Sequence, residues 1–211
     1  MLFGNWSFAP AAEAAMKAVR DPSNFQWYLL PIFALVLCVY WQEMKAKNYK
    51  AIFAALGLYS IHWLYEIANA VIAHFSGYAL WTVSAESSAF ILLVGVGAEL
   101  SLMFSVAGFS CKILPEDKKA KILGINNRWF MGIAMALFCA VVEIFLAWTP
   151  AFIWVYPWWG CIPVWITTYI PFFVGAYLVY DLPPRKQLIA VGSLMAVNIL
   201  LLATLIPLGI I

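Results

Sequence analysis

The sequence predicts an all-α integral membrane protein, a single six-helix transmembrane bundle with a short N-terminal interfacial helix. Hydrophobic residues make up 65% of the 211 residues and charged residues only 10%, a balance that soluble domains do not carry. The mean hydropathy is +0.90. Apolar runs also recur at lengths that cross a bilayer, which takes about 20 helical residues. No linker, repeat or low-complexity tract separates the runs, so one transmembrane domain is expected.

The first part of the chain is expected to differ from the rest. Residues 1–26 are predicted to form an N-terminal interfacial segment, and residues 27–211 the six-span transmembrane domain. The segment lacks the charged start and unbroken apolar run of a signal peptide. From Ala11 to Val19 it mixes small apolar residues with charged ones, a composition that fits an interfacial helix.

The six spans are bounded by charged, proline-containing or glycine-containing segments. They are predicted at residues 27–43, 51–75, 88–110, 129–149, 161–181 and 187–210. Ten of the twelve lysine and arginine residues fall in the first, third and fifth connections. Because these residues are enriched in cytoplasmic loops, the odd-numbered loops are predicted to be cytoplasmic and both termini to lie on the opposite side.

Three carboxylates, Glu66, Glu99 and Glu143, lie inside predicted spans with no lysine or arginine beside them. A charge in the bilayer is costly, so an intramembrane acid usually has a function. We expect the three side chains to converge on one pocket. At least one should be protonated at neutral pH, because the neutral acid is favoured where water is excluded. A hydrogen bond between helices is the structural alternative for each.

A polar stripe runs along the second span. His62, Glu66 and Asn69 are spaced four and then three residues apart, which places them on one helix face. His62 lies one turn before Glu66, so it could orient the carboxyl group or exchange a proton with it. The alternative is that the two side chains satisfy each other and join helices without chemistry.

Aromatic residues crowd the connection between the fourth and fifth spans, on the predicted far side of the membrane. Tryptophan commonly anchors helices at the interface, and this density could also roof a hydrophobic ligand site. The residues predicted to bind substrate are Trp63, Tyr65, Asn69, Trp154, Trp158, Trp165, Thr168, Tyr169 and Asn198. The aromatic faces would stabilise a carbocation, and the polar groups would form hydrogen bonds.

Several chemistries need residues that the chain does not supply. Two histidines are too few for a histidine-rich diiron site or bis-haem ligation, and the four cysteines form no CxxC pair. The sequence has no aspartate-rich motif for magnesium diphosphate, no GxSxG elbow and no HExxH pair. No metal and no cofactor are therefore predicted. Nucleic acid is also set aside, because the basic residues follow the membrane topology.

The stretch IHWLYE, from Ile61 to Glu66, resembles the second-helix IHxxxE pattern of the emopamil-binding sterol isomerase family, which carries the EXPERA domain. The resemblance extends to a third-helix glutamate, matched by Glu99, and to a fifth helix with a proline, an apolar run and an aspartate, matched by Pro171 to Asp181. It implies that the histidine and glutamate of the stretch handle protons and that Glu99 completes the group.

The chain also resembles the small integral-membrane terpene cyclases of fungal meroterpenoid pathways. Their second helix carries an aromatic-Glu-Ile sequence after a basic loop with a tyrosine, and here KAKNYK precedes Tyr65-Glu66-Ile67. This resemblance implies metal-free protonation of an isoprenoid epoxide or alkene, followed by deprotonation. Two features depart from the sterol isomerases, which have five helices and an asparagine near the position of Thr167 or Thr168.

The leading hypothesis is an isomerase or cyclase that protonates an alkene or epoxide of an isoprenoid or sterol-like lipid. Glu66 or Glu99 would be the acid, the other carboxylate the base, and His62 the group that tunes them. Glu143 would line the mouth of the pocket. Two alternatives stay open: a small transporter or substrate-capture component, and a non-catalytic subunit of a membrane complex. Expected partners are a lipid-soluble small molecule, membrane lipids, and a second copy or another membrane chain.

Overall fold

Four helices within residues 10–211, the part of the chain that the computed structural model describes, are long and apolar enough to cross a membrane. They are α3 (Tyr49–Ser76), α5 (Asn127–Ala147), the continuous helix Cys161–Asp181, and α8 (Pro184–Leu205). The continuous helix consists of α6 (Cys161–Val164), the π-helical turn η3 (Trp165–Tyr169) and α7 (Ile170–Asp181). These four correspond to the predicted second, fourth, fifth and sixth spans.

The remaining helices are shorter. They are α1 (Pro10–Lys17), the 3₁₀ turn η1 (Pro22–Asn24), α2 (Leu29–Lys45), α4 (Ala98–Ala107) and the 3₁₀ segment η2 (Gly108–Ile113). The prediction of a helix from Ala11 to Val19 is confirmed within two residues by α1. The first predicted span corresponds to α2, which has 17 residues.

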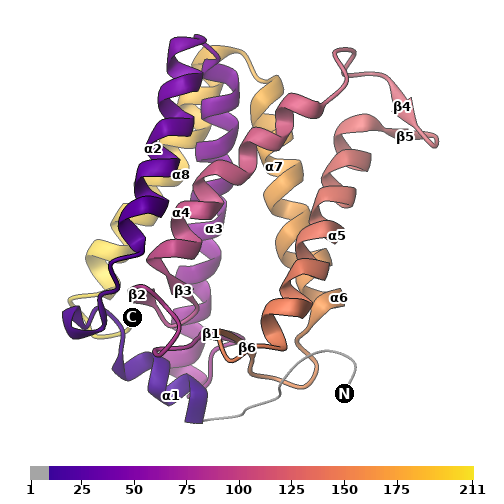
Figure 1. The fold of residues 1–211 in the computed structure, drawn as a ribbon. Helices are drawn as coiled ribbons and strands as arrows, with labels where there is room; N and C mark the ends of the chain where they lie inside the picture. Colours follow the sequence, from indigo (N-terminus) through magenta and orange to yellow (C-terminus); the bar gives the residue numbers. More distant parts are fainter. Residues whose placement is uncertain (1–9) are drawn as a thin grey trace.

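Helix α3 is the centre of the bundle. It packs against α4, α7 and α8, while α5 contacts α7 and α2 contacts α4. Helix α7 therefore lies between α3 and α5 (Figure 1). Alanine dominates the buried face of the first half of α3, with Ala51, Ala54 and Ala55 fully buried. Small residues let helix backbones approach closely, which is how helices associate where water is absent.

The predicted third span is wrong in its first half. Residues 88–110 do not form one helix: β2 (Ile91–Leu93) and β3 (Val96–Gly97) pair as antiparallel strands, and only then does α4 begin. Non-helical backbone is tolerated at membrane depth only where protein covers it. Here the backbone is paired further, since the N–H of Val83 donates to the carbonyl of Val94.

A second pair of strands closes the same end of the bundle. β1 (Trp81–Val83), which follows α3, pairs in antiparallel fashion with β6 (Phe152–Trp154), which follows α5. The register places Trp81 opposite Trp154. This pairing joins the chain segments that leave two long helices. It therefore holds the ends of α3 and α5 together through β1 and β6 (Figure 1).

The π-helical turn follows from proline chemistry. Pro171 has no N–H and therefore cannot donate to the carbonyl of Thr167, four residues earlier. That free carbonyl accepts instead from the hydroxyl of Tyr65 on α3, at 2.7 Å. The irregular turn thus binds α3 to the Cys161–Asp181 helix and displaces the following residues from regular helical positions.

The opposite end of the bundle holds the basic connections. A third strand pair, β4 (Lys121–Ile122) and β5 (Ile125–Asn126), projects there, away from the end that carries α1 (Figure 1). Arg128, at the start of α5, forms a bidentate ion pair with Asp181 at 2.8 and 3.0 Å. The pair locks the start of α5 to the end of α7.

Candidate functional site

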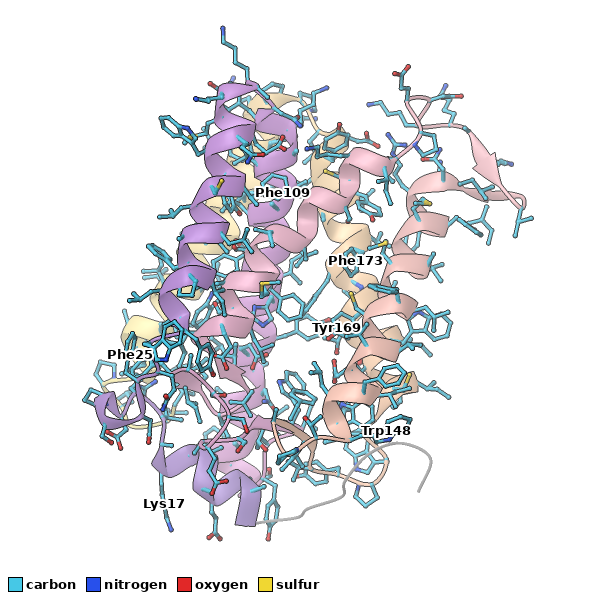
Figure 2. All side chains as sticks on the ribbon, in the orientation of Figure 1. Lys17, Phe25, Phe109, Trp148, Tyr169 and Phe173 are labelled. Carbon is cyan, nitrogen blue, oxygen red and sulfur yellow. The ribbon has the colours of Figure 1, made fainter. Side chains whose placement is uncertain are left out.

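A largely apolar pocket lies between α4 and α5, with α3 and the Cys161–Asp181 helix behind it. Figure 2 shows Tyr169 and Phe173 in the space between α4 and α5. The residues that line the pocket are His62, Glu66, Trp81, Gly95, Leu100, Phe104, Glu143, Leu146, Phe152, Val164, Thr168, Tyr169 and Phe172. They come from α3, β1, the turn between β2 and β3, α4, α5, β6 and the Cys161–Asp181 helix. Two of the three predicted carboxylates are among them.

The carboxyl group of Glu66 lies beside the indole of Trp81 and the imidazole of His62. The indole N–H of Trp81 donates to both carboxyl oxygens, at 3.2 and 3.3 Å. Nε2 of His62 lies 3.3 Å from Oε1 of Glu66, one helical turn away. Both members of this pair are at least nine-tenths buried. The predicted pairing of His62 with Glu66 is therefore present, with Trp81 as a partner that the sequence did not reveal.

His62 has an unusual position for a buried polar ring. Its imidazole stacks on Phe104 with ring centroids 4.2 Å apart. Within the described residues, neither ring nitrogen has a hydrogen-bond partner of good geometry. An unsatisfied polar group inside a protein is costly, so such a group usually serves a ligand, a water molecule or a proton. The 3.3 Å approach to Glu66 makes proton exchange the simplest role.

Glu143 on α5 forms the second polar group of the pocket. It accepts from the hydroxyl of Tyr169 at 2.5 Å and from the indole N–H of Trp154 at 2.6 Å. Each carboxyl oxygen thus has its own donor. Tyr169 itself lines the pocket, whereas Trp154 stands behind Glu143. A proton that moves between the pocket and Glu143 can therefore pass through the Tyr169 hydroxyl.

Gly95, between β2 and β3, lets the backbone approach these side chains. A Cβ atom at this position would lie 2.7 Å from Oε2 of Glu66 and would also collide with Asn69 and Trp81. No side chain larger than hydrogen fits there without moving them. The turn of the strand pair that replaces the predicted helix therefore forms part of the pocket wall.

The prediction that Glu99 joins the other two glutamates is wrong. Its carboxylate accepts from the backbone N–H of Ala89 at 3.1 Å, and Glu99 is not among the residues that line the pocket. The reason is the turn before α4. Because the helix begins only at Ala98, Glu99 lies in its first turn and faces the loop that precedes β2.

Comparison with known proteins identifies a family for the chain as a whole. Residues 9–207 match the model of a family described as an uncharacterized membrane protein family. The chain belongs to this membrane protein family. A protein of Archaeoglobus fulgidus, described as an uncharacterized protein, is 39% identical over 197 residues, which cover 91% of this chain and 93% of that protein. No solved structure matches the chain.

Several predicted substrate-binding residues do not line this pocket and form hydrogen bonds that join elements of the fold. The amide of Asn69 donates to the carbonyl of Trp81 and accepts from the N–H of Leu80, which fixes the loop after α3. The indole N–H of Trp165 donates to the carbonyl of Ile133 on α5, at 3.2 Å. Tyr65, as described above, binds the free carbonyl in the π-helical turn.

Three others lie away from the pocket. Trp158 is 61% exposed, and Trp63 and Asn198 line a separate groove between α3 and α8. Of the predicted substrate-binding set, only Thr168 and Tyr169 line the pocket. The Thr168 hydroxyl is buried there and has no partner within residues 10–211. Tyr169 reaches both the pocket and Glu143.

The pocket walls include aromatic residues that sequence reasoning did not single out. They are Trp81, Phe104, Phe152 and Phe172. A phenylalanine in an apolar span does not reveal from the sequence which residue it contacts. The contacts of Phe104 and Phe172 with His62 therefore became evident only from the structure. The contact of Trp81 with Glu66 depends on the strand pairing of Trp81 with Trp154, which lies far away in the sequence.

The free space in the pocket is small. A water-sized sphere can occupy about 50 Å³ of it. A water molecule needs about 10–15 Å³ by this measure, and an engineered cavity that binds benzene measures about 150 Å³. The space therefore suits a few water molecules, and a larger ligand must displace side chains at its edge. Leu146, which is 38% exposed, is one such side chain.

Proposed function

We propose that the protein is an integral-membrane acid–base enzyme, which protonates an alkene or epoxide of an isoprenoid or sterol-like lipid and removes a proton elsewhere. One observation carries this proposal. Two pairs of residues, each with one carboxyl group, line one aromatic pocket: His62 with Glu66, and Tyr169 with Glu143. An acid and a base that act on the same substrate must both reach it, and this arrangement allows that.

The chemistry is balanced without an oxidant or reductant. Glu66 gives its proton to one alkene carbon, and the π electrons form the new C–H bond. The positive charge then develops on a carbon that faces the rings of Phe104 and Phe172, each worth about 1–2 kcal/mol when desolvated. A neighbouring carbon loses a proton to the Tyr169 oxygen as the tyrosine proton passes to Glu143. The C–H electrons become the new double bond.

The proton must then return from Glu143 to Glu66 before the next turnover. The few water molecules that the pocket can hold provide a route between the two carboxyl groups. His62 can take part, since its Nε2 lies 3.3 Å from Glu66. The resemblance of Ile61 to Glu66 to sterol isomerases supports the same pair as the proton donor. The third-helix glutamate of the sterol isomerases, which Glu99 matches, has no role in this proposal.

The proposal is tested by deuterium exchange. Purified protein in liposomes that contain squalene, 2,3-oxidosqualene or geranylgeraniol is incubated in D₂O, and the extracted lipids are analysed by mass spectrometry. We expect deuterium on carbon, or a rearranged product, with at least one lipid. Glu66→Gln should abolish this signal, while Glu99→Gln, outside the pocket, should retain it. Equal loss in both variants, or unchanged exchange in Glu66→Gln, would reject the assignment.

Proton-coupled transport is a second candidate, and the size of the pocket favours it. Space for a few water molecules beside Glu66 and Glu143 suits a proton path better than a bulky ligand. Liposomes loaded with a pH-sensitive dye distinguish the two functions. Proton flux that Glu143→Gln abolishes, without any altered lipid, would favour transport over catalysis.

We infer further that the chain crosses the membrane six times, with α2 and the α4–η2 segment as the additional crossings. The basic connections would then face the cytoplasm and both termini the other side, as the positive-inside rule requires. A cysteine introduced at Lys119, in a variant without native cysteines, should resist a membrane-impermeant maleimide in intact cells and react after lysis. Labelling in intact cells would show that the orientation is the reverse of the one inferred.

A further inference from the structure

A second site lies on the other side of α3. The groove between α3 and α8 is lined by Tyr59, Ser60, Trp63, Met195, Asn198, Ile199 and Leu202, none of which lines the main pocket. A water-sized sphere can occupy about 160 Å³ of it. That is close to the roughly 150 Å³ of a cavity known to bind benzene. The groove can therefore hold part of a hydrophobic molecule without rearrangement.

The polar side-chain atoms of Tyr59, Ser60 and Asn198 can be accounted for one by one. The Tyr59 hydroxyl is paired with that of Ser101 at 3.1 Å, and the Ser60 hydroxyl donates to the carbonyl of Leu56 at 2.7 Å. The amide nitrogen of Asn198 donates to the carbonyl of Ser60, also at 2.7 Å. The remaining amide oxygen, Oδ1 of Asn198, is buried and has no partner among the described residues.

This lone acceptor specifies the chemistry of its partner. Asn198 is only 5% exposed, so water does not readily satisfy the oxygen. A buried carbonyl oxygen without a donor is destabilising, and a ligand with an O–H group would supply the missing donor. Asn198 lies about 21 Å along α8 from Pro184 and about 10 Å from Leu205, at 1.5 Å per residue, which places it inside a hydrocarbon core about 30 Å thick. Only a lipid-soluble molecule reaches that depth.

We propose that this groove binds a lipid alcohol, whose hydroxyl donates to Oδ1 of Asn198 and whose hydrocarbon lies against Trp63 and Ile199. A carboxylate or phosphate is disfavoured, because a second acceptor would face the amide oxygen and no cation lines the groove. The site is independent of the proposed catalytic pocket. It could hold a substrate, a product or a structural lipid of that chemistry.

The test compares two probes that differ by one donor. Native mass spectrometry of the purified protein in detergent measures the binding of geranylgeraniol and of geranylgeranyl methyl ether, which lacks the hydroxyl proton. The alcohol should bind the natural protein about tenfold more tightly, the ratio that one hydrogen bond worth about 1.4 kcal/mol gives. Asn198→Leu should bind both probes equally. Glu66→Gln should leave the preference intact, which separates this site from the catalytic pocket.

A matched pair of variants keeps the test valid if Asn198→Leu does not fold. Ile199 lines the groove, whereas the adjacent Leu200 does not, and the two are 63% and 66% exposed. Ile199→Trp should fill the groove and weaken both probes, while Leu200→Trp should not. Equal binding of alcohol and ether to the natural protein would overturn the proposal. The proposal would also be overturned if the natural protein formed a dimer that Asn198→Leu dissociates, because a second copy of the chain would then occupy the groove.

Discussion

The hydrogen bond between Tyr169 and Glu143 offers a test that requires no substrate. The Tyr169 hydroxyl lies 2.5 Å from Oε2 of Glu143, and the two residues are 8% and 6% exposed. Hydrogen bonds to charged groups contribute about 1.5–3 kcal/mol. For a chain of this size, each kcal/mol shifts the melting temperature by about 2–4 °C. Tyr169→Phe should therefore lower it by about 3–12 °C.

A double-mutant cycle separates this bond from general packing. Thermal unfolding in detergent is measured for Tyr169→Phe, for Glu143→Gln and for the double variant. Because the residues are in direct contact, the two effects should be non-additive by about 1 kcal/mol or more. Tyr65→Phe is the control, since its neutral bond to the Thr167 carbonyl should be worth only about 1 kcal/mol. Additive effects in the cycle would show that the Tyr169–Glu143 contact does not couple the residues and would remove Tyr169 as a proton relay.

Four further substitutions test the packing around Glu66 and the fold away from the pocket. Gly95→Ala should lower the unfolding free energy by about 1–3 kcal/mol and disturb Glu66, because the added Cβ atom would collide with buried side chains. Gly192→Ala in α8 is the control: no atom lies within 4 Å of its added Cβ atom, so it should be neutral or stabilising. Arg128→Ala should lower the unfolding free energy by about 3 kcal/mol, since it leaves Asp181 without its partner. Leu123→Gly should raise stability by about 1 kcal/mol in denaturant titrations, because Leu123 has a φ of 50° and is 86% exposed.

The long helices could be predicted from the sequence because their signal is local. An apolar run such as that of α5 or α8, bounded by polar residues or proline, has one stable form in a membrane. The histidine–glutamate pair was predictable for the same reason, since four residues along a helix fix the proximity of His62 and Glu66. Neither inference required knowledge of any other segment.

The prediction of a helix for the third span failed because its apolar run is ambiguous. The sequence ILLVGVG, from Ile91 to Gly97, is equally compatible with a buried helix and with two short strands. Gly95 and Gly97 suit close packing between helices, and they equally suit a turn between strands. The structure resolves the ambiguity through distant partners, including the pairing of Val83 with the Val94 carbonyl. Nothing within the run itself reveals those contacts.

The strand pair also changes what surrounds Glu66. The sequence predicted that a second carboxylate, Glu99, shares the pocket with Glu66, whereas the structure places the indole of Trp81 beside Glu66. An indole N–H can donate a hydrogen bond but cannot take up a proton. A proton that leaves Glu66 therefore has two destinations: Nε2 of His62 at 3.3 Å, or a molecule in the pocket. If a substrate replaces the water there, protonating the substrate is the remaining path that does not charge the buried imidazole.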